Sequence, residues 1–190
     1  MKKGITITII VIAIVALFAI PVIGGYNNLV ALEQSVSTSE SNIDTQLQRR
    51  SDLIPNLVST VQGYATHEKE IYTDIADARS KLAGATNVTE QATADSELSN
   101  ALSRLLVVVE RYPDLKANEN FKDLSIQLEG TENRIAIARQ DYNTAVNDYN
   151  IKRRSFPTTI TASVFGFQER PLYKASAGAE QVPTVDFNKQ

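Results

Sequence analysis

The chain of 190 residues contains no cysteine, no tryptophan and one histidine, with only eight glycines and six prolines. Without cysteine it has no disulfide scaffold, no thiol nucleophile, and no zinc or iron–sulfur site built on cysteine. The low glycine and proline content excludes a collagen-like repeat and a wholly disordered chain. The missing residue types therefore exclude several protein classes before any pattern is considered.

The single histidine, His67, completes no metal-binding or catalytic motif. The zinc motif H-E-x-x-H requires a second histidine where the sequence has Ile71, and the Glu-x-x-His motif of di-iron bundles requires glutamate where it has Tyr64. The glycines are too scattered for a phosphate-binding loop, and the sequence has no G-x-S-x-G motif. We therefore predict that the protein is not an enzyme and has no catalytic residue, cofactor or metal ion.

Residues 5–23 form an apolar segment without a charged side chain. A helix of this length extends roughly 28 Å, close to the thickness of the hydrocarbon core of a bilayer. A cleaved signal peptide would have a shorter apolar region and a small-x-small site, whereas this segment ends in Pro21-Val22-Ile23-Gly24-Gly25. We expect an uncleaved transmembrane helix that binds the lipid bilayer, with cleavage as the alternative.

Basic residues indicate the orientation of this segment. Lys2 and Lys3 precede it, whereas the first basic residue after it is Arg49. Positive charge close to a span favours the cytoplasmic side. We expect residues 1–4 to be cytoplasmic and the C-terminal domain to be extracytoplasmic, in a single-pass protein of the cell membrane.

Apolar residues after Gly25 recur at alternating intervals of four and three residues, which is typical of helices with coiled-coil character. The spacing predicts one helix from Tyr26 to Leu82, with a kink at Pro55 because proline lacks an amide hydrogen. The apolar positions of this spacing include Val36, Ile43, Leu47, Ile54, Leu57, Val61, Ile71, Ile75 and Leu82.

Two further stretches have the same spacing, through residues 98–112 and 121–149. We expect a loop at residues 83–89, with Thr89 or Thr93 capping the second helix and Asn118 or Asn120 capping the third. A short fourth helix is expected near residues 159–165. The predicted fold is all-α: the transmembrane helix, then an antiparallel up-and-down helical bundle of three long helices over residues 26–173. A flexible tail follows over residues 174–190.

Arg50 occupies a core position of the first helix, where its charge needs a carboxylate or carbonyl partner. One interpretation is a paired polar layer that fixes the register of the helices, and the other is a partner-binding groove at the Pro55 kink. The candidate residues for this layer or groove are Arg50, Asp52, Asn56, Glu132, Asn133 and Arg134.

A second charged cluster, Lys152-Arg153-Arg154, comes at the end of the third helix. The domain after the anchor is acidic and is expected outside the cytoplasm, so we expect no binding of nucleic acid. Positive charge at a helix C-terminus also interacts favourably with the helix dipole. We interpret this cluster as a solvated helix end, with lipid headgroups as the alternative.

Several sequence blocks, taken in order, resemble the LemA family, whereas the loop at residues 83–94 and the tail carry no family signature. These blocks include Arg49-Arg50-Ser51-Asp52-Leu53-Ile54-Pro55-Asn56-Leu57, Tyr112-Pro113-Asp114-Leu115-Lys116-Ala117-Asn118, Gly130-Thr131-Glu132-Asn133-Arg134-Ile135, Tyr142-Asn143, Tyr149-Asn150, Phe156-Pro157 and Gly166-Phe167. The resemblance implies a bacterial, membrane-anchored helical bundle without an established enzymatic activity. Some relatives are associated with specialised membranes such as the magnetosome, which favours a role in the envelope or in membrane organisation.

We therefore expect a membrane-anchored interaction or scaffold module of the bacterial envelope. Its expected partners are unidentified envelope proteins or further copies of the chain in a homo-oligomer. The alternative is a ligand-sensing or regulatory ectodomain that acts through a partner membrane protein.

Overall fold

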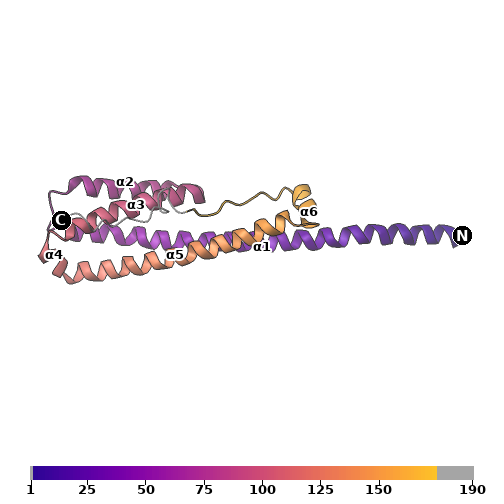
Figure 1. The fold of residues 1–190 in the computed structure, drawn as a ribbon, viewed down its shortest axis with the longest axis horizontal. Coiled ribbons are helices and arrows are strands. Elements are labelled where there is room, and N and C mark those ends of the chain that lie inside the picture. The colour runs from indigo at the N-terminus through magenta and orange to yellow at the C-terminus, as the bar shows by residue number, and fades with distance from the viewer. Residues whose placement is uncertain (1, 175–190) are drawn as a thin grey trace, which may run out of the picture. The chain divides into compact units, whose positions relative to one another are not determined.

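The computed structural model describes residues 2–174, and this part of the chain has helices and no strands. Its helices are α1 (Lys2–Gln62), α2 (Lys69–Gly84), α3 (Val88–Val109), α4 (Pro113–Ala117), α5 (Glu119–Arg154) and α6 (Thr158–Phe165) (Figure 1). The all-α prediction is confirmed. The flexible tail expected up to residue 190 lies, from residue 175 onward, outside the described residues.

The chain divides into two compact units, which are described separately. Within the described residues, unit 1 contains the chain up to Asp44 together with Ala136–Leu172, and unit 2 contains Thr45–Ile135 with residues 173–174. Helices α1 and α5 contribute residues to both units.

The prediction of one helix from Tyr26 to Leu82 is wrong. Helix α1 continues through Pro55 and ends at Gln62, and α2 begins at Lys69. The apolar spacing hides this turn because residues on either side of it, Val61 and Ile71, face the same core. Periodicity reports which face of a helix is buried and carries no information about the direction of the chain. The kink expected at Pro55 stays a prediction.

A compact turn over residues 63–68 joins α1 to α2. The backbone N–H of Ala65 donates to the carbonyl of Val61 at 2.9 Å, and the Tyr72 hydroxyl donates to the carbonyl of Ala65 at 2.6 Å. Ala65 is buried. Hydrogen bonds to the backbone and the burial of Ala65 therefore both hold the turn in place.

In unit 2, α2 and α3 form an antiparallel hairpin (Figure 1). Lys81 near the end of α2 pairs with Glu97 in the first half of α3, with nitrogen and oxygen 2.6 Å apart. Arg104, farther along α3, pairs with Asp74 near the start of α2. The order of these pairs requires the two helices to run in opposite directions.

Contacts of α1 and the turn after it show which helices pack beside them in unit 2. Arg50 of α1 pairs with Asp95 of α3 and with Glu132 of α5. Farther along the chain, the hydroxyl of Tyr64 accepts from the Asn118 amide at 3.1 Å. Unit 2 is thus an up-and-down bundle of four helical stretches: residues 45–62, α2, α3 and residues 119–135. The predicted bundle topology is correct in kind, but its first long helix supplies two of the four stretches.

Buried aliphatic side chains from every stretch fill the core of unit 2. Burial of such side chains contributes roughly 1.5–3 kcal/mol each. The fully or almost fully buried members are Ile54, Leu57, Val61, Ile75, Leu98, Leu105, Leu115 and Ile135.

The helix ends correct one expectation and confirm another. Asn87 caps α3, its side-chain oxygen accepting from the backbone N–H of Glu90 at 2.9 Å, so the expected caps Thr89 and Thr93 are wrong. Asn118 caps α5 by accepting from the N–H of Phe121 at 3.0 Å, as predicted. The short helix α4, which begins at Pro113, was not expected.

Unit 1 combines the first part of α1, the second part of α5, and α6. The short fourth helix expected near residues 159–165 is confirmed. It packs closely against α1, since a Cβ atom on Gly25 would lie 3.2 Å from the Thr161 Oγ1 atom. Beside it, the Tyr26 ring meets the rings of Phe165 and Phe167 edge to face, with centroids 4.9 and 5.6 Å apart.

Within the described part of the chain, no helix meets the length and hydropathy needed to cross a membrane. The transmembrane helix expected over residues 5–23 is unsupported by the structure and stays a prediction.

The observed cap of α3 leads to a stability prediction. Asn87→Ala removes an acceptor for the otherwise unsatisfied N–H groups at the helix start, so we expect it to lower the free energy of unfolding by about 1 kcal/mol. Thr89→Ala is the matched control, with an expected effect below about 0.5 kcal/mol because Thr89 is exposed. Chemical denaturation followed by circular dichroism measures both. Equal losses would contradict the assignment of the cap.

Candidate functional site

Arg50 of α1 lies at the centre of a buried charged cluster in unit 2. Its Nη1 atom is 2.8 Å from Asp95 Oδ1 and 2.9 Å from Glu132 Oε2. Asp95 of α3 is fully buried, whereas the Glu132 side chain on α5 is 44% exposed. Three helical stretches therefore meet at one guanidinium group, which we call the Arg50 cluster.

Burial lowers the pKa of Arg50, and the negative charge of Glu132 and the nearby Tyr173 oppose this shift. The guanidinium remains charged at neutral pH because its ordinary pKa is far above that range. One positive charge faces two carboxylates, so the Arg50 cluster is anionic on balance.

The structure brings together two of the residues proposed from the sequence, Arg50 and Glu132. The other four, Asp52, Asn56, Asn133 and Arg134, are exposed and lie outside the Arg50 cluster. Asp52 instead accepts a hydrogen bond from Gln48 at 2.8 Å. The partner-binding groove expected at Pro55 stays a prediction.

The sequence interpretation missed Asp95, the most buried member of the cluster. A signal for it exists, because the spacing of Leu98, Leu102 and Leu105 extended one step backward reaches Asp95. A carboxylate at a core position should have been matched with the arginine at the core position of the first helix.

A partly open groove of about 510 Å³ adjoins the Arg50 cluster in unit 2. Helices α3 and α5 form the walls of the groove, each with four residues at helical intervals. Arg50 and Leu57 of α1 complete its lining. The wall residues are Ser99, Leu102, Ser103 and Leu106 of α3 and Ser125, Leu128, Glu129 and Glu132 of α5. Because serine is small, the two helices leave space between their leucines. Leu106 is 49% exposed.

The charges of the groove are unequal. Glu129 and Glu132 stand on the α5 wall, and the only cation among the lining residues is Arg50, which is already engaged by Asp95 and Glu132. The groove thus offers an apolar interior with an acidic edge. Elsewhere in residues 2–174, no group of three or more His, Cys, Asp or Glu side chains is placed to hold a metal ion.

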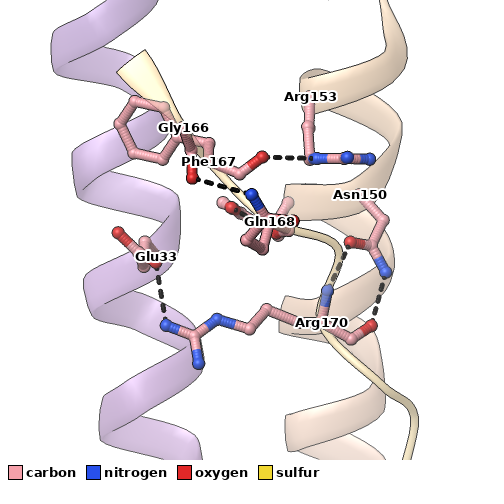
Figure 2. Close-up of polar contacts among 8 residues, drawn as sticks. Glu33, Asn150, Arg153, Gly166, Phe167, Gln168 and Arg170 are labelled. Atoms are coloured by element: carbon pink, nitrogen blue, oxygen red, sulfur yellow. Dashed lines mark hydrogen bonds and ion pairs between the residues drawn. The ribbon is translucent and has the colours of Figure 1, made fainter. Parts of the chain in front are cut away.

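Unit 1 contains a second polar system, formed by the chain after α6. Residues 167–172, here called the strap, run along α5 in an extended conformation (Figure 2). The Tyr149 hydroxyl donates to the carbonyl of Gln168 at 2.7 Å, and Arg153 Nε donates to the carbonyl of Phe167 at 2.9 Å. Asn150 bonds both the N–H and the carbonyl of Arg170, at 3.1 and 2.8 Å.

An ion pair ties the strap to α1 within the same unit. The Arg170 side chain crosses to Glu33, with 2.8 Å between nitrogen and oxygen (Figure 2). This hydrogen bond raises the pKa of Arg170. The sequence analysis did not anticipate the strap, because a segment held by its backbone carbonyls leaves no apolar periodicity.

Breaking the Arg50 cluster should be costly. Arg50→Met deprives the fully buried Asp95 carboxylate of its cation, so we expect a loss of about 3–5 kcal/mol in unfolding free energy. The double variant Arg50→Met with Asp95→Leu should regain most of that loss, because no buried charge remains. The denaturation midpoints of both variants and of the parent measure how strongly the stability effects at Arg50 and Asp95 depend on each other.

Glu132→Gln is the control for the comparison of these variants. We expect it to lower the free energy of unfolding by less than about 1 kcal/mol because Glu132 is partly exposed. An Arg50→Met protein as stable as the parent would show that the cluster does not stabilise the bundle.

Tyr142 links stability to pH in unit 1. Burial raises its pKa from 10.0 to about 12, and its hydroxyl donates to the carbonyl of Pro171 at 2.9 Å. Because the folded-state pKa lies above the unfolded one, its contribution is complete below pH 10 and is lost as pH rises toward about 12. Tyr142→Phe should cost about 1 kcal/mol at pH 8.

The difference between parent and Tyr142→Phe should then shrink as the pH rises from about 10 to about 12. Denaturation at a series of pH values measures it. A difference that stays constant over this range would refute the assignment to Tyr142.

Comparison with known proteins identifies the family of the chain. The model of the LemA family matches residues 39–187. Magnetosome protein MamQ 2 of Paramagnetospirillum magneticum is 29% identical, over 78% of this chain and 64% of the relative. Magnetosome protein MamQ of Magnetospirillum gryphiswaldense is 27% identical, over 75% and 62%. Protein LemA of Metamycoplasma hominis is 24% identical, over 85% and 74%.

The chain thus spans less than two thirds of the length of these magnetosome relatives, 64% and 62%. The family match, in contrast, covers most of the chain and includes both the Arg50 cluster and the strap. The protein belongs to the LemA family.

Proposed function

We propose that this protein is a membrane-anchored interaction module of the bacterial envelope that acts without catalysing a reaction. The groove between α3 and α5 carries the proposal. It combines exposed apolar side chains with a fixed polar end, which is the composition of a recognition site.

The apolar segment at residues 5–23 supplies the proposed anchor. Large apolar side chains along it are exposed, from Ile7 at 62% to Leu17 at 69% and Ile20 at 70%. Lipid would remove these side chains from water. Lys2 and Lys3 favour a cytoplasmic N-terminus, with the helical units outside. Two relatives named as magnetosome proteins and one named LemA support an association with membranes.

The shape of the groove favours a helical segment of a partner protein as its occupant. Its walls extend over about two helical turns, roughly 10 Å, which suits several side chains on one face of a helix. The acidic edge formed by Glu129 and Glu132 complements a basic residue beside those apolar side chains. The proposed occupant is a helix of another envelope protein or of a second copy of this chain.

A ligand-sensing role is the second candidate. The groove volume of about 510 Å³ lies within the range of small-molecule sites. In this role a partner membrane protein would transmit the signal across the membrane.

Site-specific crosslinking in intact membranes tests the proposed interaction. The chain has no cysteine, so Leu106→Cys and Val107→Cys each carry one thiol for a photoreactive reagent. Both positions are exposed and adjacent on α3, at 49% and 70%, but only Leu106 lines the groove. We expect a protein adduct from position 106 and not from position 107.

A charge variant makes this test specific for the groove. Glu129→Lys should abolish the adduct at position 106 by repelling a basic partner, whereas Asp123→Lys, on the same helix but outside the groove lining, should leave it unchanged. Equal adducts at positions 106 and 107, or none at either in a folded protein, would reject the interaction module. In the second case, a small molecule protecting the thiol at position 106 would favour the ligand-sensing role.

A further inference from the structure

Helix α6 packs against α1 immediately after the apolar segment. Gly25, which receives Thr161 of α6, lies two residues beyond Ile23. Two residues correspond to about 3 Å along a helix axis, and the headgroup layer of a bilayer is roughly 5–7 Å thick. A bilayer that ends its hydrocarbon core near Ile23 would therefore place α6 at headgroup depth (Figure 1).

The two faces of α6 differ in composition. Thr158, Thr161 and Ala162 are buried within unit 1. On the other side, Ile160 and Val164 are 52% and 72% exposed, and Phe156 just before the helix is 82% exposed. Ile160 and Val164 are four residues apart and so share one helix face. An exposed cluster of large apolar side chains indicates a surface that contacts something other than water.

Basic residues predominate around this surface. Lys152, Arg153 and Arg154 end α5 just before Phe156, and no aspartate or glutamate occurs in residues 149–168. Glu169, the next residue, is 3.7 Å from Arg153, which leaves Lys152 and Arg154 as the basic side chains available to a lipid surface. On α1, the first acidic residue of the sequence is Glu33. Basic residues beside an apolar face are the combination that binds anionic lipid.

The strap fixes α6 in this position. Gly166 ends the helix in the left-handed conformation, with φ of 77°, and Phe167 donates to the carbonyl of Ala162 at 3.0 Å. The strap then binds α5 through Arg153 and Tyr149. The exposed face of α6 is thereby held outward on a rigid support, which lowers the entropic cost of binding a surface.

We propose that α6 is an interfacial foot whose Ile160 and Val164 side chains enter the headgroup region of an anionic bilayer, with the basic end of α5 against the lipid phosphates. This inference rests on the membrane anchor of the proposed function. Its consequence is that unit 1 is attached to the membrane at two places, the segment 5–23 and α6, so that α1 cannot tilt freely about the end of its span.

Tryptophan fluorescence of the full chain in vesicles tests the foot, because the protein has no tryptophan of its own. Ile160→Trp is reconstituted into vesicles of phosphatidylcholine with phosphatidylglycerol that carry brominated acyl chains as quenchers. We expect a blue-shifted emission and strong quenching at position 160. Val164→Trp, on the same face, should behave alike. Ile137→Trp, at an exposed position of α5 in the same unit, should be neither shifted nor quenched because it lies about 25 Å along the helix from Arg154.

Leu17→Trp separates this inference from the proposed anchor. Quenching at position 17 without quenching at positions 160 and 164 would overturn the foot while the anchor stands, and would leave the α6 face to a protein partner. An unquenched tryptophan at position 17 would overturn the anchor and the foot together. Circular dichroism of each variant checks that its helices are intact.

The basic residues are tested in the Ile160→Trp background. Lys152→Gln with Arg154→Gln should weaken the docking of α6 on phosphatidylglycerol vesicles roughly fivefold for each charge removed. Quenching in these vesicles should fall to its level in pure phosphatidylcholine. Equal quenching of parent and variant in both lipids would refute the role of anionic headgroups. Arg153 is left unchanged because it holds the strap.

Discussion

The buried contact between Arg50 and Asp95 is the constraint on which unit 2 depends. Asp95 is completely buried, and a carboxylate in that environment is stable only when a cation lies beside it. A shift of either helix by one turn, about 5.4 Å, would separate the two charges. Apolar contacts would tolerate such a shift far better, because leucine replaces leucine along the same face. The ion pair therefore selects one register of α1 against α3, and Glu132 extends this selection to α5.

The groove follows from this register. Its walls belong to α3 and α5, and both helices are held to α1 through the same guanidinium. Ser99, Ser103 and Ser125 stand where larger side chains would close the space. The polar cluster and the groove are thus two parts of one arrangement: the charges set the positions of the helices, and the small side chains leave a site between them. The register layer expected around Arg50 thus lies beside a groove between α3 and α5, which differs in place and lining from the groove expected at Pro55.

Sequence periodicity predicted what depends on burial and missed what depends on polar geometry. The apolar spacing located α3 and α5 because their buried residues recur at helical intervals. It could not locate the turn at residues 63–68, where the buried face continues while the chain reverses. Asn87 was missed as a cap because Thr89 and Thr93 have suitable side chains as well, and only the backbone decides which accepts the hydrogen bond. The strap left no pattern because side chains of α5 bind its backbone carbonyl groups, which every residue possesses.

The distribution of satisfied and exposed groups explains why surfaces carry the proposed function. Arg50, Tyr149 and Arg153 direct their polar atoms to partners inside the helical units. Large apolar side chains such as Leu106 and Val164 remain exposed on helices that are themselves well anchored. Exposing such side chains costs free energy in water that burial against a partner or a lipid surface would recover. Exposed apolar side chains on helices whose positions are fixed by buried polar contacts are suited to binding a partner or a lipid surface, because the helices provide a rigid support for those contacts.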